Sequence, residues 1–402
     1  MNDQIKPRCP YFGVCGGCQL QDVPYDEQLV LKRQAVERAF SENGVEGIQV
    51  NSTWGMSNPW FYRNKVQFPI RSQNGQLIMG YFKKGTHEVV SIKECYIQDP
   101  FLTEIAKISL KIIEDRGLTA YDEVSGKGLV RHFIGRSSFI TKEMLLGIVI
   151  NAKGMPASFT LANEIKKQER LMHRQVGRQK NYPEFDEKRR IVGIIQNANV
   201  YKDNVILGEK DTKLLGSSFF MEMVGGFKFR IGLHSFFQVN PVQAKLLYKL
   251  VKKYADLTGE ELVIDAYAGI SPIALFLSDK AKQIIGVEEV ASAVKDAQEN
   301  ILLNKLYNIQ MVLGQIEKDL PKKADVIILD PPRAGCSEKA LRAVIKVAPR
   351  RIIYVSCNPK TLARDLKALI QNSYKIDAVQ PIDMFPQTDH VETVVKLTRA
   401  FS

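Results

Sequence analysis

The feature that most restricts the fold of this chain is an alternation of short apolar runs with helical segments, from about Leu233 to the C-terminus. The apolar runs are long enough for one buried strand each, and amphipathic stretches separate them. In chain order these segments read ELVIDAYAG, IALFLS, KQIIGVEEV, VKDAQENILLN, ADVIILDPP, LRAVIKVA and RIIYVSCNP. The pattern predicts an α/β domain in which helices cover a parallel sheet.

The part of the chain between Trp60 and Glu222 has a different pattern. Apolar and polar residues alternate in short runs between turn residues, as in KVQFPIRS, QLIMGYFKK, LVRHFIGRS, MLLGIVIN and IVGIIQNAN. This alternation predicts a mostly antiparallel, β-rich module with a few helices. Since 402 residues exceed the usual size of a single core, we divide the chain into an N-terminal segment (1–58), a central domain (59–230) and the α/β domain (231–402).

The charge of the chain is strongly basic, with a formal net charge of +12 and a pI of about 9.2. Basic surfaces attract polyanions because bound phosphates release condensed counterions, although a merely solvated basic surface is an open alternative. The stretch from Lys166 to Arg190 holds nine Lys or Arg against four Asp or Glu and predicts a helix end followed by an exposed loop. With no long apolar run and no signal-peptide pattern, we expect a cytoplasmic protein without a membrane partner.

Acidic residues follow two neighbouring strands of the α/β domain. The run from Glu261 to Gly269 ends one strand, and Glu288 ends the next about twenty residues later. Doubly wound sheets bind ligands at such strand ends, where a carboxylate accepts hydrogen bonds from ribose hydroxyls. This pair does not separate NAD from S-adenosylmethionine. The loop after Gly269 lacks the full G-x-G-x-x-G that approaches a pyrophosphate, which favours S-adenosylmethionine; a glycine that only permits a tight turn is the plain alternative.

Three polar segments follow apolar strands near the end of the chain. They are Asp330-Pro-Pro-Arg333-Ala-Gly, Ser356-Cys357-Asn358-Pro359 and Asp383-Met-Phe-Pro-Gln-Thr-Asp-His390-Val-Glu392. In a parallel sheet such segments meet at one edge, so we expect them to converge beside the cofactor. Asn358 and Pro359 are residue types that cap and open a helix. The N-terminus of that helix is expected to lower the pKa of Cys357, and a buried, inert cysteine is the alternative.

A cysteine beside a carboxylate suits methyl transfer to carbon 5 of uracil. That carbon becomes nucleophilic only after a thiolate adds to carbon 6, and a base must then remove the carbon 5 proton. We assign Cys357 as the nucleophile, Glu392 as the proton acceptor and Asp330 as a group that hydrogen-bonds the uracil edge. Adenine N6 and cytosine N4 methyltransferases also use a D/N-P-P motif, but with an aromatic residue where this chain has Arg333.

These motifs resemble the RNA uracil-5-methyltransferase family, which includes the tRNA position 54 enzyme and 23S ribosomal RNA enzymes. The resemblance implies a Rossmann-like, S-adenosylmethionine-dependent methyltransferase domain with Cys357 as nucleophile and Glu392 as proton acceptor. The cofactor-binding residues that it implies are Gln238, Tyr267, Glu288 and Asp330. Ser271 departs from the family, which commonly has glycine at this position, so the shape of the loop after Gly269 is open.

Four of the six cysteines lie in the first quarter of the chain, at Cys9, Cys15, Cys18 and Cys95. Their spacing alone fits zinc about as well as an iron–sulfur cluster. Many members of the family hold a [4Fe–4S] cluster on cysteines of this arrangement, so the resemblance implies that these four are its ligands and that the cluster is structural. A disulfide framework is not expected in a cytoplasmic protein.

The RNA-binding surface is predicted less specifically. Ribosomal members of the family often carry a small β-barrel domain before the cysteines, and only eight residues precede Cys9, so we expect that domain to be absent. We place RNA contacts on the central domain, at Phe61-Tyr-Arg-Asn-Lys65 and Arg131-His132, where aromatic and basic side chains could stack bases and bind phosphates. A plain core role for Phe61 and Tyr62 is an equal alternative.

The sequence thus predicts an RNA (uracil-C5)-methyltransferase. We place 23S rRNA ahead of tRNA as the substrate, because the cysteine cluster is commoner among the ribosomal members of the family. RNA is the expected macromolecular partner, with no DNA, and the chain is expected to be a monomer. Two hypotheses of other classes stay open: an RNA-binding or assembly factor that has lost its chemistry, motivated by Ser271, and a redox sensor built on the cysteines.

Overall fold

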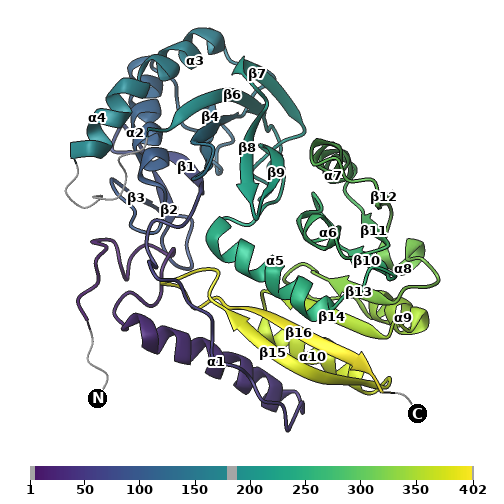
Figure 1. Ribbon diagram of the computed structural model, residues 1–402. Helices are drawn as coiled ribbons and strands as arrows, with labels where there is room; N and C mark the ends of the chain where they lie inside the picture. The colour runs from purple at the N-terminus through teal and green to yellow at the C-terminus, as the bar shows by residue number, and fades with distance from the viewer. Residues whose placement is uncertain (1–4, 179–187, 401–402) are drawn as a thin grey trace.

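The computed structural model describes residues 5–178 and 188–400, which form two large sheets with helix α5 (Pro241–Ala255) between them (Figure 1). Within these residues no helix combines the length and apolar character that crossing a membrane requires. The basic stretch from Lys166 to Arg190 contains a helix that ends at Arg178, and the loop predicted after it lies largely in residues 179–187, outside the described part.

The first sheet has seven strands in the order β3-β2-β1-β4-β5-β6-β7, all paired antiparallel except β5 with β6. Its strands are β1 (Lys65–Gln73), β2 (Gln76–Phe82), β3 (Val89–Ser91), β4 (Val130–Ser137), β5 (Glu143–Ile150), β6 (Arg190–Ala198) and β7 (Lys210–Gly216). All five alternating runs of the sequence analysis are strands here, so the mostly antiparallel character of this region is confirmed.

Three helices pack on one face of this sheet: α2 (Pro100–Asp115), α3 (Ser158–Lys167) and α4 (Glu169–Arg178). Helix α2 begins where Asp99 accepts a 3.0 Å hydrogen bond from the Phe101 backbone N–H and Pro100 occupies the first turn. This is the usual chemistry of a helix start. The buried side chains of Phe101, Leu102 and Ile105 then pack against β1 and β4.

The second sheet follows the predicted α/β pattern, with the strand order β12-β11-β10-β13-β14-β16-β15. Its strands are β10 (Leu262–Ala266), β11 (Gln283–Glu288), β12 (Ile309–Leu313), β13 (Val326–Leu329), β14 (Arg351–Ser356), β15 (Tyr374–Ile382) and β16 (Glu392–Arg399). The strands from β12 to β14 are parallel, and β16 is antiparallel to both of its neighbours. The strand order reverses direction between β10 and β13, which is where open α/β sheets bind ligands.

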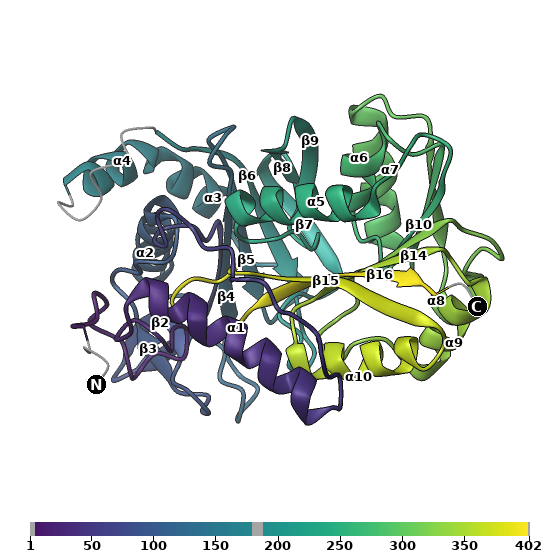
Figure 2. The same cartoon turned by 60° about the horizontal axis from the view of Figure 1, so that its bottom comes forward.

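Helices cover both faces of the second sheet. One face carries α5, α6 (Pro272–Leu277) and α7 (Ala291–Leu303). The other carries α8 (Ile316–Asp319), α9 (Glu338–Val347), α10 (Pro359–Ile370) and the N-terminal helix α1 (Tyr25–Glu42). Helix α1 lies along α10 and β15 (Figure 2), where Val36 and Phe40 join the core of this face. The fold class is therefore confirmed as a Rossmann-like α/β domain with a mostly antiparallel β-rich domain.

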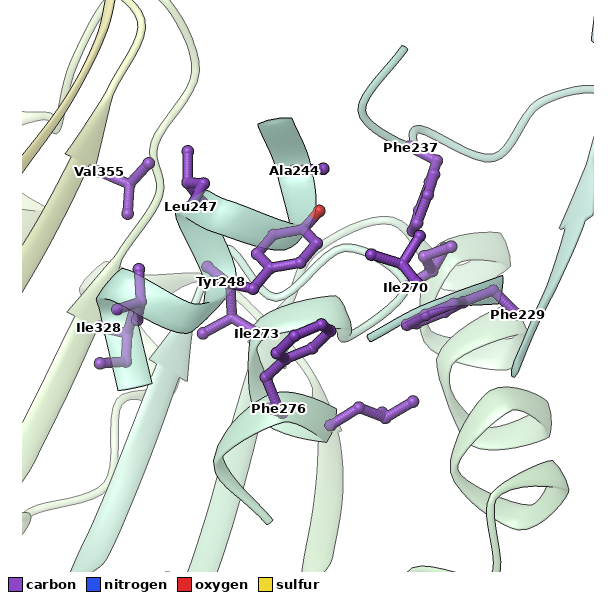
Figure 3. Packing of buried hydrophobic residues seen from close by; sticks show 14 of the residues in the cluster. Phe229, Phe237, Ala244, Leu247, Tyr248, Ile270, Ile273, Phe276, Ile328 and Val355 are labelled. Atoms are coloured by element: carbon purple, nitrogen blue, oxygen red, sulfur yellow. The ribbon is translucent and has the colours of Figure 1, made fainter. Parts of the chain in front are cut away.

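A single core connects the two sheets. The hairpin of β8 (Phe219–Val224) and β9 (Phe227–Gly232) and helix α5 fill the space between them. In Figure 3, Tyr248 of α5 packs against Phe276 of α6, with 5.1 Å between ring centroids, and Phe229 of β9 packs against Phe237 at the same distance. Because this core extends across the predicted boundary at residue 230, the domain limits of the sequence analysis stay a prediction.

Candidate active site

A cavity of about 860 Å³ opens at the carboxyl ends of β10, β11, β13 and β14. All six residues predicted for catalysis or cofactor binding line it: Gln238, Tyr267, Glu288, Asp330, Cys357 and Glu392. Residues of the N-terminal segment and the central domain complete the wall, among them Gly17, Tyr62, Arg63 and Ile97. The structure thus brings together residues that lie more than 150 positions apart in the sequence, although their individual roles stay predictions.

The cofactor end of the cavity is a tight turn between β10 and α6. Glu288 at the end of β11 accepts hydrogen bonds from the backbone N–H groups of Gly269 (3.0 Å) and Val290 (2.9 Å). These bonds fix the carboxylate at the mouth of the turn. Its remaining lone pairs are acceptors of the kind that bind ribose hydroxyls. Tyr267 and the buried Gln238 supply an aromatic ring and an amide on the same wall.

Ser271 has a backbone conformation that glycine adopts more readily than serine. Its backbone φ is +64°, in the left-handed region that side chains disfavour. The residue is fully buried at the start of α6, and its hydroxyl lies 2.9 Å from the Met311 sulfur. The departure from the family therefore leaves the turn formed, with a serine held in a conformation that favours glycine.

Asp265 is a buried acid that the sequence analysis did not assign to the site. It lies on β10, is 1% exposed and accepts a hydrogen bond from the Ala274 backbone N–H, while its Oδ1 atom has no partner among the described residues. Burial raises its pKa to about 8, with further increases from Asp330 and Glu288. The signal in the sequence was its position in the strand-end run before Gly269, where a polar residue interrupts an apolar strand.

Cys357 follows β14 directly and is half-buried. As predicted, Asn358 caps α10 by accepting a 3.1 Å hydrogen bond from the Lys360 backbone N–H, with Pro359 in the first turn. The predicted lowering of the thiol pKa is wrong, however. Burial raises the pKa of Cys357 to about 11, assisted by the negative charges of Glu392 and Asp330, and the opposing effect of Arg333 is smaller.

The two carboxyl groups beside Cys357 are also shifted toward their protonated forms. Burial raises the pKa of Asp330 to about 7. Burial and the neighbouring Asp330 hold the pKa of Glu392, which is 4% exposed at the start of β16, well above its usual range. Burial raises the pKa of all three acidic groups, Asp330 raises those of Glu392 and Cys357 further, and Glu392 also raises that of Cys357. A nearby positive charge would stabilise the ionised forms of such a site.

The loop from Asp383 to Glu392 is held by the N-terminal helix, which the sequence analysis did not foresee. The Lys32 ammonium and the Asp383 carboxylate form a fully buried ion pair at 2.5 Å, and Lys32 also donates to the Phe385 carbonyl at 3.1 Å. One turn away on α1, the Gln28 amide nitrogen donates to the Gln387 side chain at 3.1 Å. The backbone N–H groups of residues 19 and 20 donate to the Gln387 carbonyl.

Arg136 holds the loop that leads to Gln238. It is buried on β4 and donates to the carbonyls of Gly232 (2.7 Å) and Ser235 (2.5 Å). The Ser235 hydroxyl in turn donates to Asp296 at 2.6 Å. The central sheet therefore fixes one wall of the cavity through a buried guanidinium.

The predicted RNA-contact residues separate into two groups. Tyr62 and Arg63 line the cavity, whereas Phe61 is buried beside Tyr96. Arg131 and His132 are buried in β4, where the Arg131 guanidinium donates to the carbonyls of residues 199 and 201. The prediction that Arg131 and His132 contact RNA is therefore wrong, because both side chains lie within the central domain.

The four N-terminal cysteines lie in one neighbourhood. Cys95 is buried, Cys15 and Cys18 pack against the same apolar cluster, and Cys9 packs beside Phe61. Burial raises the pKa of the Cys18 thiol to about 12, and Cys15 and Cys9 raise it further by their charge. Across residues 5–178 and 188–400, however, no group of three or more Cys, His, Asp or Glu side chains is arranged to hold a metal ion. The cluster thus stays a prediction.

Comparison with known proteins places these features in a family. A family model described as tRNA (Uracil-5-)-methyltransferase matches residues 313–400, and one described as Methyltransferase small domain matches residues 228–353. An uncharacterized RNA methyltransferase of Bacillus cereus is 40% identical over 398 residues, covering 97% of this chain and 82% of the relative. One of Clostridium acetobutylicum is 39% identical over 406 residues, covering 99% and 84%.

Among solved structures, the fold is similar to the tRNA (uracil-54, C5)-methyltransferase of Pyrococcus abyssi in complex with S-adenosyl-L-homocysteine. The TM-score is 0.74 at 25% identity, and the match covers 96% of this chain and 86% of that one. The fold and the cavity thus define an S-adenosylmethionine-dependent RNA methyltransferase. More particularly, the chain belongs to the RNA uracil-5-methyltransferase family.

Proposed function

We propose that this protein transfers a methyl group from S-adenosylmethionine to carbon 5 of a uridine in RNA, through a covalent bond between Cys357 and carbon 6 of the uracil. The observation that carries this proposal is that Cys357, Asp330 and Glu392 line the same cavity as the turn between β10 and α6, which we call the cofactor turn. A catalytic thiol and a base on opposite sides of a pyrimidine are what carbon 5 chemistry requires.

The steps follow from the side chains of the cavity. The Cys357 thiolate adds to carbon 6, which makes carbon 5 a carbon nucleophile. S-adenosylmethionine supplies an electrophilic methyl group on a sulfonium when bound. Carbon 5 bonds to the methyl group as the bond between that methyl and the sulfonium sulfur breaks, which would leave a neutral thioether. Glu392 then takes the carbon 5 proton, and the bond between carbon 6 and Cys357 breaks to restore the ring and the thiolate.

The raised pKa values fit this order of events. In the structure the pKa values of Cys357, Asp330 and Glu392 are all raised, chiefly because of burial. A sulfonium next to them stabilises their ionised forms by Coulomb attraction. The thiolate and the carboxylate base thus form preferentially when the cofactor occupies the site, which protects the thiol at other times.

The test is a methylation assay with labelled S-adenosylmethionine on unmodified tRNA and 23S rRNA transcripts, with nucleoside analysis of the product. We expect 5-methyluridine with the native chain and none with Cys357→Ala, because the thiolate makes carbon 5 reactive. Label in another nucleoside, or label that survives the substitution, contradicts the covalent mechanism. No transfer, together with no S-adenosylmethionine binding in calorimetry, favours an RNA-binding or assembly factor instead.

We propose 23S rRNA as the substrate, with tRNA as the alternative. The four N-terminal cysteines favour the ribosomal members of the family, whereas the similar Pyrococcus abyssi structure is that of a tRNA enzyme. The same assay separates the two, since each transcript is offered alone.

We also propose that Cys9, Cys15, Cys18 and Cys95 bind a [4Fe–4S] cluster. The support is their shared neighbourhood and the complete set of four thiolate donors that such clusters use. Anaerobic purification is expected to give about four iron and four sulfide per chain, the content of one [4Fe–4S] cluster, together with the visible absorbance of such a cluster. Cys18→Ser should lose both, while Cys336→Ser should keep them. Zinc in place of iron would contradict the cluster.

A further inference from the structure

Cys357 lies between two cavities. Besides the large cavity that holds the cofactor turn, a second one of about 480 Å³ opens on its other side, between α1 and the start of α10. Cys357, Arg333 and His390 line both cavities. The other charged residues that line the second cavity are Arg38, Glu42, Lys360 and Asp389.

The second cavity is lined by three exposed cations from three separate elements. Arg38 comes from α1, Arg333 from the loop after β13 and Lys360 from α10. In the described parts of the chain, none of these three side chains forms an ion pair with a carboxylate. Arg33, by contrast, lies five residues before Arg38 on the same helix and is paired with Glu37 at 3.3 Å.

The carboxylates of the second cavity do not neutralise these cations. Only Glu42 and Asp389 contribute acids to its wall, and Asp389 lies 3.6 Å from the Nδ1 atom of His390. The large cavity is more acidic, because Glu288, Glu289 and Asp296 line it in addition to Asp330 and Glu392. Its Lys and Arg lining consists of Arg63 and the shared Arg333. An RNA strand that reaches Cys357 therefore meets more acids than cations on the cofactor side and more cations than acids on the other.

The position of Cys357 restricts how a nucleotide can approach it. A uracil that receives the thiol at carbon 6 must be unstacked and inserted beside Cys357, while its ribose and phosphates stay linked to the rest of the RNA. Phosphates are repelled by the acidic cofactor side and attracted by unpaired Lys and Arg. A volume of about 480 Å³ is within the range of cavities that bind small ligands.

We propose that the second cavity binds the nucleotide that adjoins the target uridine in the RNA, with its phosphodiester held by Arg38 and Lys360. This inference rests on the proposed function and adds a subsite to it. Arg333 faces both cavities, so it can contact the phosphate that links the two nucleotides. The bound chemistry is a phosphodiester of single-stranded RNA, and base identity is not read by these cations.

The test compares two charge-matched double variants. Arg38→Gln with Lys360→Gln removes two cations from the second cavity, whereas Arg33→Gln with Lys367→Gln removes two from the same helices outside its lining. Binding of the transcript that the native chain methylates is measured against salt concentration. For the cavity variant, the slope of the logarithm of the RNA association constant against the logarithm of salt concentration should become shallower by about 0.7 for each cation removed. The control should keep the native slope.

A second measurement locates the contact in the RNA. Neutral methylphosphonate linkages are placed one at a time on either side of the target uridine. One of them should weaken binding to the native chain about tenfold, as expected for a lost phosphate contact, and should cause no further loss with Arg38→Gln/Lys360→Gln. Affinity for S-adenosylmethionine should be equal in all variants, which also reports that they are folded.

The outcomes separate this inference from the proposed function. A native chain that methylates neither RNA contradicts the proposed function itself. A native chain that forms 5-methyluridine, with a cavity variant that keeps the native salt slope and the native response to methylphosphonates, overturns the subsite alone.

Discussion

At the scale of single residues, the cofactor turn is built from backbone conformations that side chains disfavour. Tyr267, Gly269 and Ser271 have φ values of +64°, +54° and +64°, so two residues with side chains adopt the left-handed region within five positions. Such conformations persist only where the surroundings determine them. Here β10, Pro272 in the first turn of α6 and the Glu288 carboxylate all constrain the turn.

Replacing Ser271 with glycine tests this strain. Relief of a left-handed conformation is worth about 1–2 kcal/mol, and the greater freedom of glycine in the unfolded chain offsets about 0.4–1 kcal/mol. We expect Ser271→Gly to raise the free energy of unfolding by roughly 0.5–1 kcal/mol in urea titrations. Ser278→Gly is the matched control, because that residue is right-handed, and it should destabilise. Equal destabilisation by both changes would show that the turn is not strained.

At the scale of elements, the decisive contacts are those of α1 with the loop from Asp383 to Glu392. The sequence predicted the strands, the cap of α10 and the convergence of the three polar segments, because these depend on local pattern and on parallel-sheet topology. It did not predict the Lys32–Asp383 pair, whose members lie 351 residues apart. Lysine and aspartate at helix and loop positions ordinarily face solvent, so nothing local distinguishes a buried pair from an exposed one.

Neighbouring residues of α1 offer a sharp comparison. Lys32→Ala leaves the Asp383 carboxylate buried without its cation, which we expect to cost about 3–5 kcal/mol of stability. Arg33→Ala removes a pair whose side chains are about 40% exposed, and we expect a loss below about 1 kcal/mol. Urea unfolding of the two variants measures both values. Similar small losses would mean that the buried pair does not hold the loop.

At the scale of the whole molecule, the junction of the two sheets contains a buried acid. Glu222 on β8 is fully buried and accepts hydrogen bonds from the side chains of Ser138 (2.6 Å) and Asn64 (3.2 Å), which flank strands of the central sheet. Burial raises its pKa to about 7. No local pattern singles out this glutamate, because its partners Ser138 and Asn64 come from a different part of the chain.

This acid makes the junction sensitive to pH. Burial raises its pKa from the ordinary value of 4.5 to about 7 in the folded protein, so folding favours the protonated carboxyl. The resulting stability is present below pH ~4.5 and is lost as pH rises through ~7, with a magnitude of about 3 kcal/mol. We expect Glu222→Gln to flatten the fall in unfolding free energy between these pH values in urea titrations. The exposed Glu209→Gln should retain the native pH profile, and identical profiles for both would exclude Glu222 as the cause.

The contact of α1 with the loop after β15 has a consequence for biosynthesis. The ribosome makes Lys32 of α1 351 residues before its partner Asp383. Contacts of such long sequence separation form late because of the loop-closure entropy that they require. The thiol of Cys357 therefore gains its completed surroundings only after the segment around Asp383 has been made and has met α1, and a nascent chain without that segment lacks the arrangement proposed to react with RNA.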